Sequence, residues 1–551
     1  MRKKLRLALA ATVVALGAAG AVWAGSASAG GAHAASYPTV TIAFGTAPDY
    51  LDPSETYTTQ GAEAAWVSYL GLYTYAHKNG TAGSAVIPAL ATADPVVTDG
   101  GKTYTMYVRK GEKFANGMPV VASDFTFGIE RALKLNWGGD SWYTGNIVGA
   151  LAYQKGKAST ISGIQTDDST GKVVIHLIAP YGAFVNILAF PESCLLPPNT
   201  AMKSLTNDPP PGFGPYEIKD VVPDKSWEGV PNPYYTAHPI PGIPVAHVIV
   251  KAVVESTTTL EAEDVLDGSA DLFDTGDQVP PSVIAQAKSS STATYGTYAI
   301  PQTFYFFMNV TTKPFNSQLV REAVVMATDR RVLSRLASGN LVPACYFIPP
   351  GLVGHNTRPC PYGNPDGAPN LKKAKALIAQ SGDKGDAVTV WSEERQPRTQ
   401  YVTYYASVLS ELGFKVTIKP ISDANYFPTI GNLKNDPQTG FADWDEDFPN
   451  PVDFYLLLTK AGIQSVNNEN FSQVDDPKIE SAVAKLAPVP SNKLGTVATQ
   501  WQNLDYYVAQ KAYEDVYGYQ LWPKFASDKI DYGALVIQPS YGWDWTSIRL
   551  K

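Results

Sequence analysis

Short β-type runs alternate with amphipathic helical segments between residues 300 and 460, and this alternation constrains the fold more than any other feature of the sequence. The run FYFFMNV at 304–310 has the continuous apolar character of a strand that is buried on both faces. Helical patterns follow at 317–328, 371–381 and 399–412. Strands that alternate with helices pack as a sheet covered by helices, so this half of the chain is predicted to be an α/β lobe.

The length of the chain indicates more than one lobe. At 551 residues it exceeds what a single hydrophobic core supports. Hydrophobic residues make up 44% of the sequence and charged residues only 17%, which is typical of a folded protein and not of a disordered one. A cluster of Pro and Gly, NDPPPGFGPYE at 207–217, predicts a sharp boundary in the first half of the chain.

Residues 1–36 have the pattern of a secretory signal peptide. Basic residues within positions 2–6 precede an apolar run at 7–22, and small-x-small sites follow at 27–29 and 32–34. The segment is either cleaved at one of these two sites or retained as a membrane anchor, because the apolar run is fairly long. We therefore expect an exported protein of the cell envelope, in a periplasmic space or at the outer face of the cell membrane.

The charge balance excludes a nucleic-acid partner. The formal net charge is −8, and without the first 36 residues, which hold four basic and no acidic side chains, 39 basic residues face 51 acidic ones. A surface of this sign repels phosphate backbones and weakly attracts cationic ligands.

The three cysteines suggest one disulfide. Cys345 and Cys360 are close enough in sequence to close a short loop in an oxidising compartment, and Cys194 is then left as a small buried residue. None of the three lies near residue 30, so the lipid-acceptor cysteine of bacterial lipoproteins is missing from that region.

The stretch GFADWDEDFPNP at 440–451 is unusually acidic for this chain. Its carboxylates are Asp443, Asp445, Glu446 and Asp447. The spacing of the three Asp residues matches the first half of an EF-hand loop, but Phe448 and Phe454 occupy the positions that require Gly and a bidentate Glu. The stretch is therefore not predicted to bind calcium.

Signatures of catalysis are scarce. The sequence contains no H-E-x-x-H, no G-x-S-x-G and no Walker A motif. One S-x-x-K match, from Ser381 to Lys384, follows a predicted helix and is typical of a helix end. We expect no catalytic residue, no metal ligand and no cofactor, although a pair of carboxylates could still serve a glycosidase.

Residues 87–131 resemble a known family. They read IPALATADPVVTDGGKTYTMYVRKGEKFANGMPVVASDFTFGIER, which is similar to the signature of the family 5 extracellular solute-binding proteins of ABC importers, a group with dipeptide, oligopeptide and nickel receptors. The matching positions are Pro88, Leu90, Ala91, Asp99, Tyr104, Thr105, Arg109, Gly111, Phe114, Asn116, Gly117, Pro119, Ala122 and Asp124. Val121 departs from the family, which often has a helix-capping Thr there, so the cap must come from elsewhere or the helix start frays.

The resemblance implies a two-lobed, hinged α/β fold of the periplasmic-binding-protein type, in the large three-subdomain class of type II. Lobe I would comprise 37–300 and 520–551, with an extra subdomain at about 76–205. Lobe II would comprise 301–519.

The resemblance also assigns a ligand site. Trp444, Asp445, Glu446 and Asp447 match a W-x-x-D segment whose Asp binds the ligand's α-ammonium group in peptide-binding members. Tyr426, Trp142 and Tyr143 correspond to aromatic positions near the ligand, with a place in the core as the alternative for each. If the stretch is extended, Asp443, Asp445 and Asp447 share one face. They would then favour a ligand with several positive charges, unless Lys or Arg side chains pair with them.

The function implied is that of a monomeric receptor, which binds a peptide or small cationic solute and delivers it to a membrane ABC permease with its ATPase subunits. The alternatives are a secreted hydrolase that uses a carboxylate pair, and a family relative that binds a nickel complex or an oligosaccharide.

Overall fold

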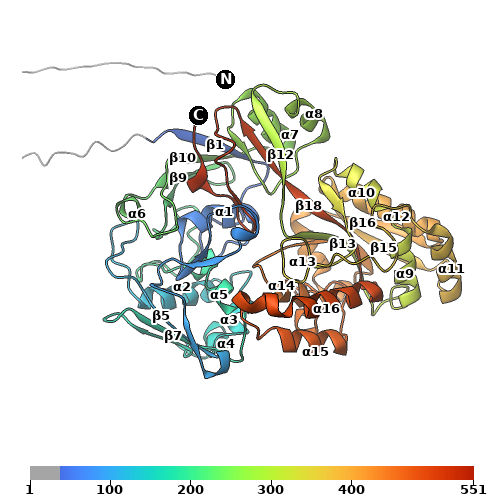
Figure 1. Ribbon diagram of the computed structural model, residues 1–551, viewed down its shortest axis with the longest axis horizontal. Coiled ribbons are helices and arrows are strands. Elements are labelled where there is room, and N and C mark those ends of the chain that lie inside the picture. The colour runs from blue at the N-terminus through green and yellow to red at the C-terminus, as the bar shows by residue number, and fades with distance from the viewer. Residues whose placement is uncertain (1–36) are drawn as a thin grey trace, which may run out of the picture. The chain divides into compact units, whose positions relative to one another are not determined.

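Residues 37–551 are described by a computed structural model, and the predicted signal peptide at 1–36 lies outside them. Within the described residues, one twelve-stranded sheet runs through both lobes in the order β16-β15-β17-β13-β18-β11-β1-β10-β9-β8, with β12 and β14 also paired to β18 (Figure 1). Its strands are β1 (Thr39–Phe44), β8 (Tyr216–Val222), β9 (Ser226–Pro231), β10 (Ile249–Val254), β11 (Leu272–Phe273), β12 (Ala293–Ala299), β13 (Gln302–Met308), β14 (Leu341–Pro343), β15 (Ala387–Glu393), β16 (Lys415–Ile421), β17 (Thr439–Asp445) and β18 (Glu514–Ser527).

The predicted buried strand is β13. All seven of its residues are buried, because β17 and β18 pair with it on either side and helices cover the sheet. One of these helices, α9 (Gln318–Ala327), buries Val320, Ala323, Val324 and Ala327 at helical spacing. The α/β architecture predicted for this half of the chain is confirmed.

The long strand β18 connects the two lobes. Its first part pairs with β13, where Phe304 lies opposite Gly518, and its second part pairs with β12, where Ala299 lies opposite Leu521. Figure 1 shows this strand passing from one lobe to the other. Below, lobe II denotes residues 301–519, the bounds predicted from the sequence.

A separate four-stranded sheet forms the extra subdomain. Its order is β4 (Val96–Thr98), β5 (Thr103–Tyr107), β7 (Lys172–His176) and β6 (Ile164–Asp167). The helix α2 (Ser123–Lys134) packs against it and buries Phe125, Ile129 and Ala132, the stripe expected for an amphipathic helix.

The start of α2 is capped from a distance. Asp168 accepts hydrogen bonds from the backbone N–H of Ser123 at 2.7 Å and from its hydroxyl at 2.8 Å. Asp124 accepts one from the N–H of Val121 at 2.8 Å. The missing Thr at position 121 is thus replaced by carboxylates, which satisfy the free N–H groups of the first turn.

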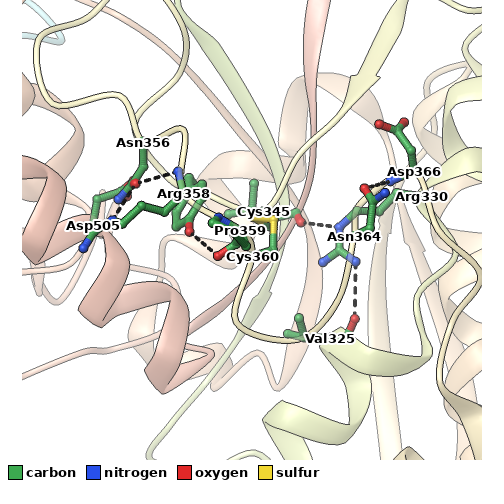
Figure 2. The surroundings of a disulfide bond; sticks show 12 residues. Val325, Arg330, Cys345, Asn356, Arg358, Pro359, Cys360, Asn364, Asp366 and Asp505 are labelled. Carbon is green, nitrogen blue, oxygen red and sulfur yellow. Dashed lines mark hydrogen bonds between the residues drawn. A yellow bond between two sulfur atoms is a disulfide. The ribbon is translucent and has the colours of Figure 1, made fainter.

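The predicted disulfide between Cys345 and Cys360 is present in lobe II, with the two Cα atoms 6.1 Å apart (Figure 2). Beside it, Tyr346 donates a hydrogen bond to the carbonyl of Pro359 at 2.9 Å, and Arg358 donates one to Asn356 at 3.0 Å. Cys194 is a buried free thiol, as expected.

Candidate functional site

The carboxylate of Asp447 lies where lobe I and its extra subdomain meet lobe II. Oδ2 of Asp447 accepts hydrogen bonds from Nε1 of Trp142 and from the hydroxyl of Tyr57, both at 3.2 Å. Trp142 belongs to the short helix α3 (Ser141–Thr144), and Tyr57 precedes α1 (Thr59–Ser68). One side chain of lobe II is therefore bonded to two separate parts of lobe I.

A second carboxylate shapes the turn that carries Asp447. Asp453, in the first turn of α14 (Pro451–Leu456), accepts the backbone N–H of Asp447 at 2.9 Å and the indole N–H of Trp444 at 3.1 Å, both through Oδ2. The ring of Trp444 is therefore directed at Asp453. These bonds hold the backbone so that the carboxylate of Asp447 faces the other lobe.

A cavity of about 100 Å³ adjoins Asp447, and acids dominate its charged lining. Its carboxylates are Glu192, Asp445, Glu446 and Asp447. Its other residues are Tyr57, Thr59, Ala62, Trp137, Phe190, Ile300, Pro301, Trp522, Pro539, Ser540 and Tyr541, so no Lys or Arg of residues 37–551 contributes to the wall. We call this space the acidic cavity.

The pKa values of these carboxyls differ. Burial raises the pKa of Asp447 to about 6, opposed by the hydrogen bonds from Trp142 and Tyr57. Burial raises the pKa of Glu446 to about 8, and it holds the pKa values of Asp445 and Glu192 well above their usual range. At pH 7, Asp447 is therefore ionised and Glu446 is protonated.

Two oxygens of the acidic cavity have no donor among the described residues. Oδ1 of Asp445 and Oε2 of Glu446 are buried and unpaired there, although Oε1 of Glu446 accepts a hydrogen bond from Ser540 at 3.2 Å. Because buried polar atoms in folded proteins are nearly always bonded, these two oxygens mark a place for a polar partner.

Asp443 has a different role. Its Oδ2 pairs with Nη2 of Arg398 at 2.8 Å, and Nη1 of the same guanidinium pairs with Glu393 at 2.8 Å. Asp443 does not line the acidic cavity. Of the three Asp residues expected to share a ligand-facing side, Asp445 and Asp447 line the cavity, while Arg398 neutralises Asp443.

The lobes also touch away from the acidic cavity. Arg395 of lobe II pairs with Asp277 of lobe I at 3.0 Å. The backbone N–H of Gly182, in the extra subdomain, donates to the carbonyl of Ala487 at 2.8 Å, and the carbonyl of Gly182 accepts from the N–H of Ser491 at 3.2 Å. Closure of two lobes over a site between them is consistent with these contacts.

Comparison with known proteins identifies the family. A model of the bacterial extracellular solute-binding proteins, family 5, matches residues 85–465. The chain belongs to this family. Across the part that the structure describes, no helix is long and apolar enough to cross a membrane, and no group of three or more His, Cys, Asp or Glu is arranged to hold a metal ion.

Relatives of this family 5 protein include two peptide receptors by name. It is 25% identical over 477 residues to the probable D,D-dipeptide-binding periplasmic protein DdpA of Escherichia coli K12. The matched region covers 84% of this chain and 84% of DdpA. It is 27% identical over 397 residues to the glutathione-binding protein GsiB of Salmonella choleraesuis. The matched region covers 69% of this chain and 69% of GsiB.

Solved structures confirm the two-lobed fold. The clavulanic acid biosynthesis oligopeptide binding protein 2 superposes with a TM-score of 0.82 at 19% identity, over 93% of this chain and 96% of that one. The murein tripeptide binding protein MppA of Escherichia coli superposes with a TM-score of 0.76 at 20% identity. The superposition covers 94% of this chain and 99% of MppA.

The aromatic residues singled out from the sequence lie in different places in this family 5 protein. Trp142 contacts Asp447 directly. Tyr143 is fully buried and bonded to Ser193 at 2.8 Å. Tyr426 is also fully buried, and its hydroxyl donates to the carbonyls of Phe441 and Trp391. Tyr143 and Tyr426 therefore occupy the core positions that were the alternative for each.

Several cavity residues are not evident from the sequence. Glu192 follows Pro191 in an otherwise ordinary stretch and lies more than 250 positions before Asp447. Tyr57, Trp522 and Tyr541 come from opposite ends of lobe I. Only the fold brings these residues together, and no local spacing in the sequence predicts that they line one cavity.

Proposed function

We propose that this protein is the extracellular receptor of an ABC importer and that it binds a peptide, or a similar solute with a primary ammonium group, between its lobes. The ammonium group binds at Asp447. The receptor then presents the solute to a membrane permease driven by ATPase subunits. This proposal rests on membership of the family, on the peptide-binding relatives and on the charge of the acidic cavity.

The observation that carries the proposal is the set of four carboxylates around a cavity to which the described residues bring no basic side chain. Burying an unpaired charge costs several kcal/mol, so an ionised Asp447 in closed lobes needs a cation. The N–H of Trp142 and the hydroxyl of Tyr57 hold the carboxylate in place but do not neutralise it. A ligand ammonium supplies the missing charge through a charge-assisted hydrogen bond to the carboxylate of Asp447.

The protonation states set the preferred ligand charge. At pH 7 Asp447 is ionised and Glu446 is protonated, so a ligand with one positive charge at this end matches these two carboxyls. A second positive charge beside Glu446 would have to displace the proton of that carboxyl. Dications therefore bind with proton release and gain affinity as the pH approaches the pKa of Glu446, about 8.

Native mass spectrometry of the purified protein with a mixed peptide library tests the proposal. We expect intact peptides to be retained, and we expect retention to be lost when their amino termini are acetylated. Equal retention of acetylated peptides would contradict an ammonium site. Appearance of cleaved peptides would instead indicate a hydrolase.

A further inference from the structure

A second and larger cavity lies between the extra subdomain and lobe II. Its volume is about 670 Å³, which falls in the range of pockets for small molecules, whereas the acidic cavity at about 100 Å³ is well below that range. The acidic cavity has room for an ammonium group and its nearest carbon atoms, but the remainder of a peptide must lie elsewhere.

The lining of the second cavity is nearly uncharged. Apolar side chains such as Val86, Val185 and Leu494 form much of the wall, with prolines and a few amide and hydroxyl groups between them. Asp94 is the one charged residue among the described residues of the lining, and its side chain is solvent-exposed. This chemistry favours an uncharged, mainly apolar group with few hydrogen bonds.

The two cavities approach each other along the chain at residues 447–449. Asp447 lines the acidic cavity and Pro449 lines the second one, so their Cα atoms are separated by at most about 7 Å of chain. The ring of Phe448, between them in sequence, is fully buried and packs edge-on against Trp142 at 5.0 Å between centroids. It also lies 6.0 Å from Phe190, which lines the acidic cavity.

The second cavity depends on contact between the lobes. Its wall includes Gly182 and Asn186 from the extra subdomain and Ser491 from lobe II. The backbone of Gly182 bonds to that of Ser491, and the Ser491 hydroxyl donates to Asn186 at 2.5 Å. A group held here is therefore enclosed by the same closure that brings Asp447 to Trp142.

We propose that the second cavity holds an uncharged, largely apolar body of the ligand whose ammonium group binds at Asp447. The ligand is recognised at two places, by charge at one end and by apolar contact at the other. The assignment of the ammonium group and the apolar body to one molecule rests on the proposed function. The preference of the second cavity for apolar groups is independent of the proposed function.

Calorimetry with two peptide amides at pH 7 tests this assignment. Leu-Leu-Leu amide and Gly-Gly-Gly amide each carry one ammonium group and no carboxylate, and they differ only in apolar bulk. Wild type is expected to bind the leucine peptide at least tenfold more tightly, because leucine side chains gain affinity on burial. Val185→Phe, which narrows the second cavity, should reduce this preference at least threefold while changing Gly-Gly-Gly amide affinity less than twofold.

Val466→Phe is the matched control, because Val466 is solvent-exposed and lines neither of the two cavities. It should leave both affinities unchanged. Absence of a leucine preference in wild type would overturn the assignment. Equal effects of Val185→Phe on the two peptides, including no effect on either, would also overturn it.

Asp447→Asn separates this inference from the proposed function. It should weaken both peptides equally and preserve their ratio. If it weakens neither, the ammonium site at Asp447 is contradicted, and the result with Val185→Phe still decides the second cavity.

Discussion

The indole N–H of Trp142 donates a hydrogen bond to Oδ2 of Asp447 at 3.2 Å, across 305 positions of sequence and from one lobe to the other. The donor stabilises the ionised form of the carboxyl and so opposes the burial that raises the pKa of Asp447 to about 6. One contact therefore serves both lobe closure and the charge state of the ammonium site.

Trp142→Phe keeps the aromatic ring and removes the donor. We expect the pKa of Asp447 to rise, so the affinity for Gly-Gly-Gly amide should fall about tenfold at pH 6 and much less at pH 8, in line with the loss of one hydrogen bond to a charged group. Calorimetry at the two pH values measures this. Trp391→Phe, which removes an indole from β15 away from the cavity, should show no such pH dependence.

The affinity for a monocationic peptide should rise with pH. Below the pKa of Asp447, about 6, a proton must leave the carboxyl before the ammonium group can bind. The affinity should therefore fall about tenfold for each pH unit below 6, and binding there should release close to one proton. Above pH 7 the affinity should level off, and it should fall again above about pH 8, where the α-amino group of the peptide loses its proton. Proton release is obtained from calorimetry in buffers of different ionisation enthalpy, and a pH-independent affinity between pH 5 and 7 would refute the assignment.

The stability of the ligand-free protein should have the opposite pH dependence. Burial raises the pKa of Glu446 from 4.5 to about 8, so the folded state binds the proton more strongly than the unfolded state does. Its contribution is fully present below pH 4.5 and is lost as the pH rises through 8. Thermal unfolding from pH 5 to 8.5 should show a falling midpoint in wild type, and Glu446→Gln should flatten this decline.

Gly182 should be required for closure. A Cβ atom at this position would lie 1.9 Å from the carbonyl oxygen of Val489, which belongs to the backbone of lobe II. Gly182→Ala is therefore expected to hold the lobes apart and to weaken Gly-Gly-Gly amide binding at least tenfold, with a larger radius of gyration in solution scattering when peptide is present. Gly495→Ala is the matched control, since a Cβ there meets no atom within 4 Å.

The sequence predicts the scaffold better than the site. The buried strand β13 and the helix α9 follow from local patterns, and the disulfide follows from the spacing of Cys345 and Cys360 in a chain with the sequence pattern of a signal peptide. These features depend on neighbouring residues or on short loops. Asp447 could be singled out only through its resemblance to the W-x-x-D segment of the family.

The surroundings of Asp447 depend on long-range contacts. Arg398 and Asp443 lie 45 positions apart, and nothing in the acidic stretch shows which of its carboxylates that arginine neutralises. Glu192 joins the cavity because the extra subdomain closes against lobe II. Such pairings follow from the tertiary fold, so the charge of the cavity could not be derived from the acidic stretch alone.

The comparison of Asp447→Asn with Asp443→Asn tests the central claim most directly. Both variants remove one acid from the same stretch, but only Asp447 lines the acidic cavity, while Asp443 pairs with Arg398. In calorimetry at pH 7 with Gly-Gly-Gly amide, we predict a loss of at least tenfold in affinity for Asp447→Asn. For Asp443→Asn we predict a change of less than threefold, once thermal unfolding shows that both variants are folded. Equal affinities of Asp447→Asn and wild type would contradict the assignment of Asp447 as the residue that binds the ligand's ammonium group.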